Sequence, residues 1–359
     1  MSWFSKRFTG LTHPKVYLPL LLLVFLAILP LLPRNTFYED IIFSSFSYAT
    51  LALAWNLVGG FAGQISLGHT AFFGIGAYTS TLLYLNCSLS PWLGMLAGAG
   101  LSALVAIGIG VPCFRLKSHF FALATIAIGE VLRYLASYWR GLTQGGVGLL
   151  IPFKPGLENF MFQSKIPYAY LAFVLMLIML FISYSIRNSK FGFQLISLRE
   201  DQDAAESLGV KTSRCKLIAL IISAFFTSIS GTFYAQYLLF IDPATLFSLN
   251  FSIELALFTI IGGIGTVAGP ILGAFMLTPL DVFLRAWLGG VSAGLSFIVY
   301  GLVLMVAVKY FPLGLSGWIR TWYPSLLQKL PGGKQPVEME SKAPLALALK
   351  RQTFAEEKG

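Results

Sequence analysis

Charged side chains are scarce in this sequence. Only 11% of its 359 residues are Asp, Glu, Lys or Arg, whereas 56% are hydrophobic. A typical soluble protein carries about 25% charged residues. The deficit, together with a mean hydropathy of +0.76, excludes an ordinary soluble domain and predicts a membrane protein. The net charge of +10 favours cytoplasmic basic loops over nucleic-acid binding, because the basic residues stand in loops and tails beside apolar runs.

Cysteine is nearly absent, and so are the motifs of an enzyme. Cys87, Cys113 and Cys215 show no CxxC or metal-ligand spacing, so they indicate neither a disulfide framework nor a zinc site. The stretch nearest to a Walker A motif, at 209–212, lacks the glycine directly before the lysine and the glycine upstream. No HExxH, clustered histidine or aspartate pair is present. We therefore expect no cofactor, no metal and no ATP hydrolysis by this chain itself.

Long apolar runs dominate the remainder, and ten of them approach the length of about 20 residues that a helix needs to cross a bilayer. The first could be a signal peptide, but no small-residue cleavage site follows it, so we interpret it as a retained helix. The sequence thus predicts an all-α polytopic membrane protein, with a transmembrane domain over 16–318 and a disordered tail over 319–359. The runs lie near 16–33, 41–58, 64–84, 91–111, 119–139, 166–184, 216–241, 252–266, 268–287 and 290–308.

The distribution of lysine and arginine predicts the orientation. If segment 1–15 is cytoplasmic, the inner segments hold 19 of the 25 basic residues, the outer ones hold four, and Arg133 and Arg285 fall within spans. Cytoplasmic loops carry the excess of Lys and Arg in membrane proteins. Both termini and the segment 187–215 are therefore expected on the cytoplasmic side.

The segment 187–215 is the one long charged interval between the runs. It contains Asp203, Ala204 and Ala205, with Gly209 four residues after the second alanine. This pattern indicates a short amphipathic helix closed by a turn glycine. It resembles the EAA loop of ABC-importer permeases, although Asp203 stands where the general pattern has Glu. The resemblance implies that the segment couples the permease to a cytoplasmic ATPase.

Two joins between runs are rich in glycine: VGGFAGQISLGH at 58–69 and IGGIGTVAGP at 261–270. Such interruptions often mark broken helices that line the substrate path of a transporter, and they equally allow close helix packing through small residues. Spacing alone leaves both interpretations open. The candidate path residues are Gly63, Gln64, Ser66, Gly68, Thr70, Gly262, Gly263 and Gly265.

A few polar residues stand within the runs. Glu130 and Arg133 can form a local pair one helical turn apart or a polar element of the path; we favour the pair. His69 has no second ligand at metal spacing and is expected to be a buried, hydrogen-bonded histidine. Glu254 is expected at the start of the eighth span, where the helix dipole stabilises a carboxylate.

Five stretches, in order, resemble the LivM family of branched-chain amino acid ABC-importer permeases. They are the 33 residues LALAWNLVGGFAGQISLGHTAFFGIGAYTSTLL from Leu51, TIAIGEVLRYL with Thr125 and Gly129, GGVG at 145–148, the loop with Asp203, and SIELALFTIIGGIGTVAGPILGA from Ser252. The closing FPLGLSG at 311–317 fits too. The match covers most of the chain.

The resemblance implies a subunit of the bacterial inner membrane with several partners. These are a sister permease, two cytoplasmic ABC ATPases and a periplasmic or lipid-anchored binding protein that delivers an amino acid. Related permeases carry urea or short amides, so that substrate class stays open. A secondary transporter without an ATPase is the alternative from another class, but Glu130 is the one mid-membrane carboxylate and it has a basic neighbour.

Overall fold

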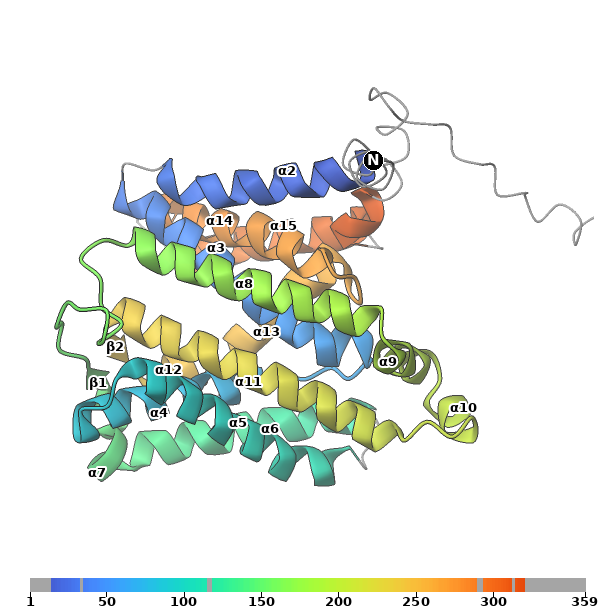
Figure 1. Ribbon diagram of the computed structural model, residues 1–359, viewed down its shortest axis with the longest axis horizontal. Helices are drawn as coiled ribbons and strands as arrows, with labels where there is room; N and C mark the ends of the chain where they lie inside the picture. Colours follow the sequence, from blue (N-terminus) through green and yellow to red (C-terminus); the bar gives the residue numbers. More distant parts are fainter. Residues whose placement is uncertain (1–13, 33–34, 115–117, 289–292, 312–313, 320–359) are drawn as a thin grey trace, which may run out of the picture. The chain divides into compact units, whose positions relative to one another are not determined.

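The apolar runs fold into long helices (Figure 1). The computed structural model describes residues 14–32, 35–114, 118–288, 293–311 and 314–319, and each of the ten predicted runs coincides with a helix in these ranges. Those helices are α2 (Pro14–Ile28), α3 (Thr36–Asn56), α4 (His69–Cys87), α5 (Pro91–Cys113), α6 (Ser118–Tyr138), α8 (Ile166–Arg187), α11 (Thr212–Leu238), α13 (Leu249–Gly263), α14 (Gly269–Leu288) and α15 (Ala293–Tyr310).

Shorter elements connect them. They are the 3₁₀ turns η1 (Leu29–Leu31) and η3 (Gly145–Val147), the π-helical turn η2 (Leu57–Phe61), the helices α7 (Arg140–Thr143), α9 (Lys190–Glu200), α10 (Gln202–Ser207) and α12 (Pro243–Leu246), and the strands β1 (Leu149–Leu150) and β2 (Phe240–Ile241). The strands pair antiparallel, Leu149 opposite Ile241. The predicted segment 1–15 and tail 319–359 fall almost entirely outside the described residues.

Within the described ranges, eight helices are long and apolar enough to cross a membrane. The predicted count of ten is therefore only partly met, because α2 and α4 do not qualify. Helix α4 carries His69, Thr70, Ser80 and Thr81 as buried side chains, and these lower its hydropathy. A helix enclosed by protein can carry hydroxyls that a lipid-facing helix cannot. Along α6, α8 and α15, by contrast, large apolar side chains such as Phe297 are exposed.

Residues Phe25–Ile319 form one compact unit, and the contacts described below lie within it. Helix α3 is its most buried spanning helix and packs against α8, α11, α13 and α14. Helix α11 also packs along α4 and α5. Helices α9 and α10 lie at one end of this unit, and β1, β2 and α7 lie at the opposite end (Figure 1). We call these the loop end and the ribbon end.

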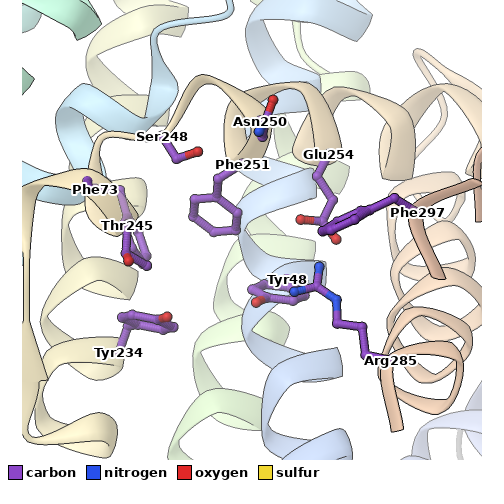
Figure 2. A pocket seen from close by; sticks show the side chains of 11 residues that line it. Tyr48, Phe73, Tyr234, Thr245, Ser248, Asn250, Phe251, Glu254, Arg285 and Phe297 are labelled. Atoms are coloured by element: carbon purple, nitrogen blue, oxygen red, sulfur yellow. The ribbon is translucent and has the colours of Figure 1, made fainter. Parts of the chain in front are cut away.

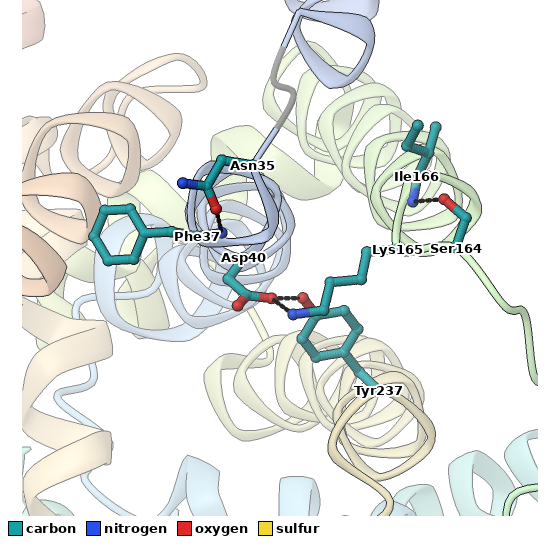
Figure 3. Close-up of polar contacts among 7 residues, drawn as sticks. All are labelled: Asn35, Phe37, Asp40, Ser164, Lys165, Ile166 and Tyr237. Atoms are coloured by element: carbon teal, nitrogen blue, oxygen red, sulfur yellow. Dashed lines mark hydrogen bonds and ion pairs between the residues drawn. The ribbon is translucent and has the colours of Figure 1, made fainter.

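A polar contact ties three helices together at the ribbon end (Figure 3). Asn35 caps α3 by accepting a hydrogen bond from the backbone N–H of Phe37 at 3.2 Å. One turn further, the carboxylate of Asp40 accepts hydrogen bonds from Lys165 Nζ at 2.5 Å and from the Tyr237 hydroxyl. Both side chains of the Asp40–Lys165 ion pair are more than a third exposed, so the pair orients these helices more than it stabilises them.

Candidate functional site

The first glycine-rich join is an unwound segment at the loop end. Helix α3 continues through the π-helical turn Leu57–Phe61, the chain then leaves helical geometry from residue 62 to 68, and α4 begins at His69. Gly63 has a φ of +65°, a conformation that glycine adopts without strain. The predicted interruption of the helix is therefore present.

Protein groups satisfy the backbone that this unwinding frees. Trp55 Nε1 donates to the carbonyl of Ser66 at 2.7 Å, and the N–H of Leu67 donates to Thr125 Oγ1 at 3.1 Å. Unpaired backbone groups are not tolerated against lipid. These bonds let an irregular segment persist inside a membrane domain.

His69 is buried next to this segment and uses both ring nitrogens. Its Nδ1 lies 2.9 Å from Ser66 Oγ and its Nε2 lies 2.8 Å from Ser223 Oγ. Ser223 donates its own proton to the carbonyl of Ala54 at 2.6 Å. Nε2 must therefore be the N–H donor, and Nδ1 accepts from Ser66. The neutral ring is a structural link between α4, α11 and α3, with no nitrogen left for a metal.

The second join, Gly263–Gly269 between α13 and α14, lies against the first through Asn56. This fully buried side chain accepts from the N–H of Gly265 and donates to the carbonyl of Thr266, both at 2.9 Å. Sequence reasoning missed Asn56. The available signal was its position as a lone amide within the apolar run LALAWNLVGG.

The glycines of the two joins allow close approach of backbone to backbone. A Cβ on Gly60 would lie 2.7 Å from the Gly265 nitrogen, and one on Gly262 would lie 1.9 Å from the Gly269 carbonyl oxygen. Gln64, Ser66 and the other candidate path residues are mostly buried, and the hydroxyl of Thr70 lies 3.0 Å from that of Ser252. The joins thus combine unwinding with close packing, and a role in lining a passage stays a prediction.

Arg199, in the last turn of α9, connects the charged segment to both joins. Its Nη1 donates to the carbonyl of Gly60 at 3.1 Å, and its Nη2 lies 2.6 Å from the carboxylate of Glu200. A Cβ on Gly63 would lie 2.6 Å from Arg199 Cγ, and one on Gly265 would lie 2.3 Å from its Nη1. One guanidinium therefore contacts the place where the two interrupted helices meet.

The DAAESLG pattern forms the short helix α10. Asp201 caps it by accepting from the N–H of Ala204 at 3.0 Å, and Gly209, with a φ of +85°, reverses the chain after it. Asp203 and Ala204 are exposed and Ala205 is buried. The side chain of Leu208 is 84% exposed, which is unusual for an apolar residue outside the membrane-spanning helices.

Polar side chains fix α10 to the start of α11. Glu206 accepts hydrogen bonds from Thr212 Oγ1 at 2.5 Å and from Gln202 Nε2 at 3.0 Å. Buried Lys216 donates from Nζ to Gln202 Oε1 at 2.7 Å. The hydrogen bonds from Thr212 and Gln202 lower the pKa of Glu206 below its usual range. These bonds attach α10 to the first turns of α11.

The ionisable residues of α6 form the local pair. Arg133 Nη2 lies 2.6 Å from Glu130 Oε2, and both side chains are about a third exposed. The Arg133 guanidinium also lies 4.6 Å from the centre of the Tyr134 ring. The geometry matches the favoured interpretation of a self-neutralising pair.

A cavity of about 390 Å³ lies nearer the ribbon end, lined by residues of α3, α4, α11, α12, α13, α14 and α15 (Figure 2). Glu254 and Arg285 both line it, and the Nε of Arg285 donates to Asp281 at 2.9 Å. The expectation that Glu254 opens its helix is wrong. Helix α13 begins at Leu249, and the dipole effect falls off within the first turn.

Comparison with known proteins identifies a matching family model over residues 37–308, the branched-chain amino acid transport system permease component. The chain is 28% identical to the LivM permease protein of Escherichia coli over 87% of this chain and 80% of that protein. It is 25% identical to the LivH permease protein of the same organism, over 76% of this chain and 91% of that protein.

A third relative has a different named substrate. The autoinducer 2 import system permease LsrC of Yersinia pseudotuberculosis is 26% identical over 78% of this chain and 81% of that protein. No solved structure matches this chain.

Proposed function

Since this chain belongs to the family of branched-chain amino acid transport system permease components, we propose that it imports branched-chain or related aliphatic amino acids. It is a multi-pass membrane protein and an ABC-importer permease, not itself an enzyme. The observation that carries the finer proposal is the cavity, in which a carboxylate and a guanidinium stand beside aromatic rings. Such a lining suits a zwitterion with an apolar side chain.

The energy for import comes from partner ATPases that bind the exposed face of α10. Asp203, Ala204 and Leu208 supply that face. The attachments described above support this role, because Arg199 links α9 to the two joins and Glu206 links α10 to α11. Movement of the two short helices would therefore reach α3, α11, α13 and α14 together.

The remaining partners and the orientation follow from the family and the charge pattern. We infer a sister permease, two cytoplasmic ATPases and a binding protein that delivers the substrate from outside. The 19 basic residues of the inner segments support cytoplasmic termini and a cytoplasmic loop end. The ribbon end then faces the binding protein, and the substrate enters the cavity from there.

The unwound join 62–68 and its partner at Gly262–Gly265 are proposed to gate the inner part of the path. Both lie against the Arg199 side chain of α9, which movement of α9 would displace. Half-helix ends also offer partial charges to a passing zwitterion. Because both joins are tightly packed in this conformation, a passage along them requires a second arrangement of Arg199 and Asn56.

Reconstitution tests this function. The chain is assembled with its sister permease, ATPases and binding protein in liposomes, and ATP-dependent uptake of labelled leucine, urea and autoinducer 2 is compared. We expect uptake of leucine that requires ATP and both ATPases. Leucine uptake driven by a proton gradient in the absence of the ATPases would instead support a secondary transporter. ATP-dependent uptake of urea or autoinducer 2 without leucine uptake would overturn the substrate class.

A further inference from the structure

The cavity near the ribbon end has the size and the walls of a small-molecule site. Its volume of about 390 Å³ lies within the range of roughly 300–1,000 Å³ that is usual for ligand pockets. Three aromatic rings form one wall: Phe73 lies 5.1 Å from Phe251 and 5.3 Å from Tyr234, measured between ring centres. This wall offers an apolar surface to a side chain of a few carbon atoms.

The opposite wall carries charge that the protein does not balance. Arg285 is paired with Asp281 through its Nε. Glu254 has no ion pair or hydrogen bond among the described residues. When Glu254 is ionised, these three side chains carry one more negative than positive charge. An unpaired carboxylate is costly within a membrane domain and marks a functional site with a missing partner.

The two charged groups face the same space. In Figure 2 the Glu254 carboxylate is drawn above the Arg285 guanidinium, and the Tyr48 ring is drawn at the level of the guanidinium. They are not joined by an ion pair, so their oxygen and nitrogen atoms are more than 4.0 Å apart. The terminal nitrogens of Arg285 donate no hydrogen bond to another described residue, and its side chain is half exposed. An ammonium and a carboxylate on one carbon atom are suited to bridge such a gap.

We propose that this cavity binds the zwitterionic head group of a free α-amino acid, with the ammonium on Glu254, the carboxylate on the terminal nitrogens of Arg285, and the aliphatic side chain against Phe73 and Phe251. This deepens the proposed function and rests on it. An ammonium donates to carboxylate oxygens, and a guanidinium matches a carboxylate by its planar fork. The ligand's ammonium also supplies the positive charge that Glu254 lacks. Urea and neutral amides lack both charges, so the site would select against them.

A binding measurement on the assembled permeases and ATPases, without the binding protein, tests the site directly. The probe is labelled L-leucine, and two competitors each remove one charge: isoamylamine lacks the carboxylate and 4-methylvalerate lacks the ammonium. For Glu254→Gln we expect a loss of leucine affinity of about 10- to 100-fold. Isoamylamine should no longer displace the leucine that this variant still binds. For Arg285→Lys we expect competition by 4-methylvalerate to weaken, while isoamylamine still competes.

Glu39→Gln is the matched control, because Glu39 is a carboxylate on α3 that does not line the cavity. It should leave leucine affinity unchanged. Leucine affinity of Glu254→Gln equal to wild type would overturn the proposal, as would a failure of the wild-type complex to bind leucine. If Glu254→Gln weakens competition by both compounds equally and also lowers the Tm of the complex, Glu254 belongs to a structural charge cluster only. That result would also overturn the proposal. Leucine uptake by the wild-type importer tests the proposed function separately, so the two failures are distinguishable.

Discussion

Arg199→Ala should uncouple ATP hydrolysis from transport. The guanidinium joins α9 to the carbonyl of Gly60, at 3.1 Å, and lies against Gly63 and Gly265. Removal of the side chain leaves α9 and α10 attached to α11 through Glu206 and Thr212, so the ATPases still have a helix to bind. The connection to the two joins is the part that is lost.

The size of the effect follows from the lost contact. A hydrogen bond to a charged group contributes about 1.5–3 kcal/mol. The Arg199 side chain is 33% exposed, and solvent screening reduces this figure to about 1–2 kcal/mol. Since 1.4 kcal/mol corresponds to a factor of ten, the number of leucine molecules imported per ATP hydrolysed should fall about 5- to 30-fold.

The assay measures uptake and ATP hydrolysis in the same liposomes. The control is Glu200→Gln, which removes the ion pair of Arg199 but leaves its bond to Gly60. Because Glu200 is 67% exposed, this pair contributes little, and coupling should stay within twofold of wild type. If Arg199→Ala also keeps its ratio of uptake to hydrolysis within twofold, the bond to Gly60 transmits nothing and the reasoning is refuted.

Further predictions concern the same elements. Ala204→Glu and Gly209→Arg should abolish uptake while the chain stays in the membrane, because Ala204 lies on the exposed face of α10 and Gly209 follows its end. Copurification of the ATPases should fall in parallel, and unchanged copurification would exclude docking on α10. The purified chain alone should bind no labelled ATP, because no phosphate-binding loop is present. In a variant without native cysteines, Gln64→Cys should react with small water-soluble thiol reagents faster in one nucleotide state; inertness in every state during active transport would place the path elsewhere. The hydrogen bonds from Thr212 and Gln202 lower the pKa of Glu206. The attachment of α10 to α11 through Glu206 should therefore persist at neutral pH and be lost only as the pH falls through that lowered pKa. Limited proteolysis of the segment 187–215 at decreasing pH checks this, and cleavage that begins at neutral pH would contradict it.

Local pattern was sufficient to locate the helices. Asn35, Ser189 and Asp201 cap α3, α9 and α10 as such residues commonly do, and Gly209 ends α10 with the expected positive φ. The predicted count of ten spans is met by eight helices of the described residues, and α4, which packs between α5 and α11, falls short in hydropathy. The buried hydroxyls of α4 are a consequence of that enclosure.

The contacts of the candidate site were less accessible to sequence reasoning. Arg199 and Gly60 are 139 residues apart, and Asn56 and Gly265 are 209 apart. Neither pair has a local spacing that would reveal it. The glycine-rich joins were found because glycine is a local signal, whereas the side chains that hold them were not. The cavity was missed for the same reason, because its charged residues lie on α13 and α14 and its rings on α3, α4, α11, α13 and α15.

The cavity and the joins lie on the same helices, and through them we expect the proposed substrate binding to be connected to the ATPases. Tyr48 lines the cavity and Gly60 accepts the bond from Arg199; they are separated along α3 and its π-helical turn by about 18 Å, at 1.5 Å per residue. Glu254 and Gly262 lie about 12 Å apart on α13 by the same measure. We therefore expect a shift of Arg199 that changes how the two joins pack to move the parts of α3 and α13 from which Tyr48 and Glu254 line the cavity. We propose that binding and hydrolysis are coupled in this way through the helices, with the glycine-rich joins as the points that bend.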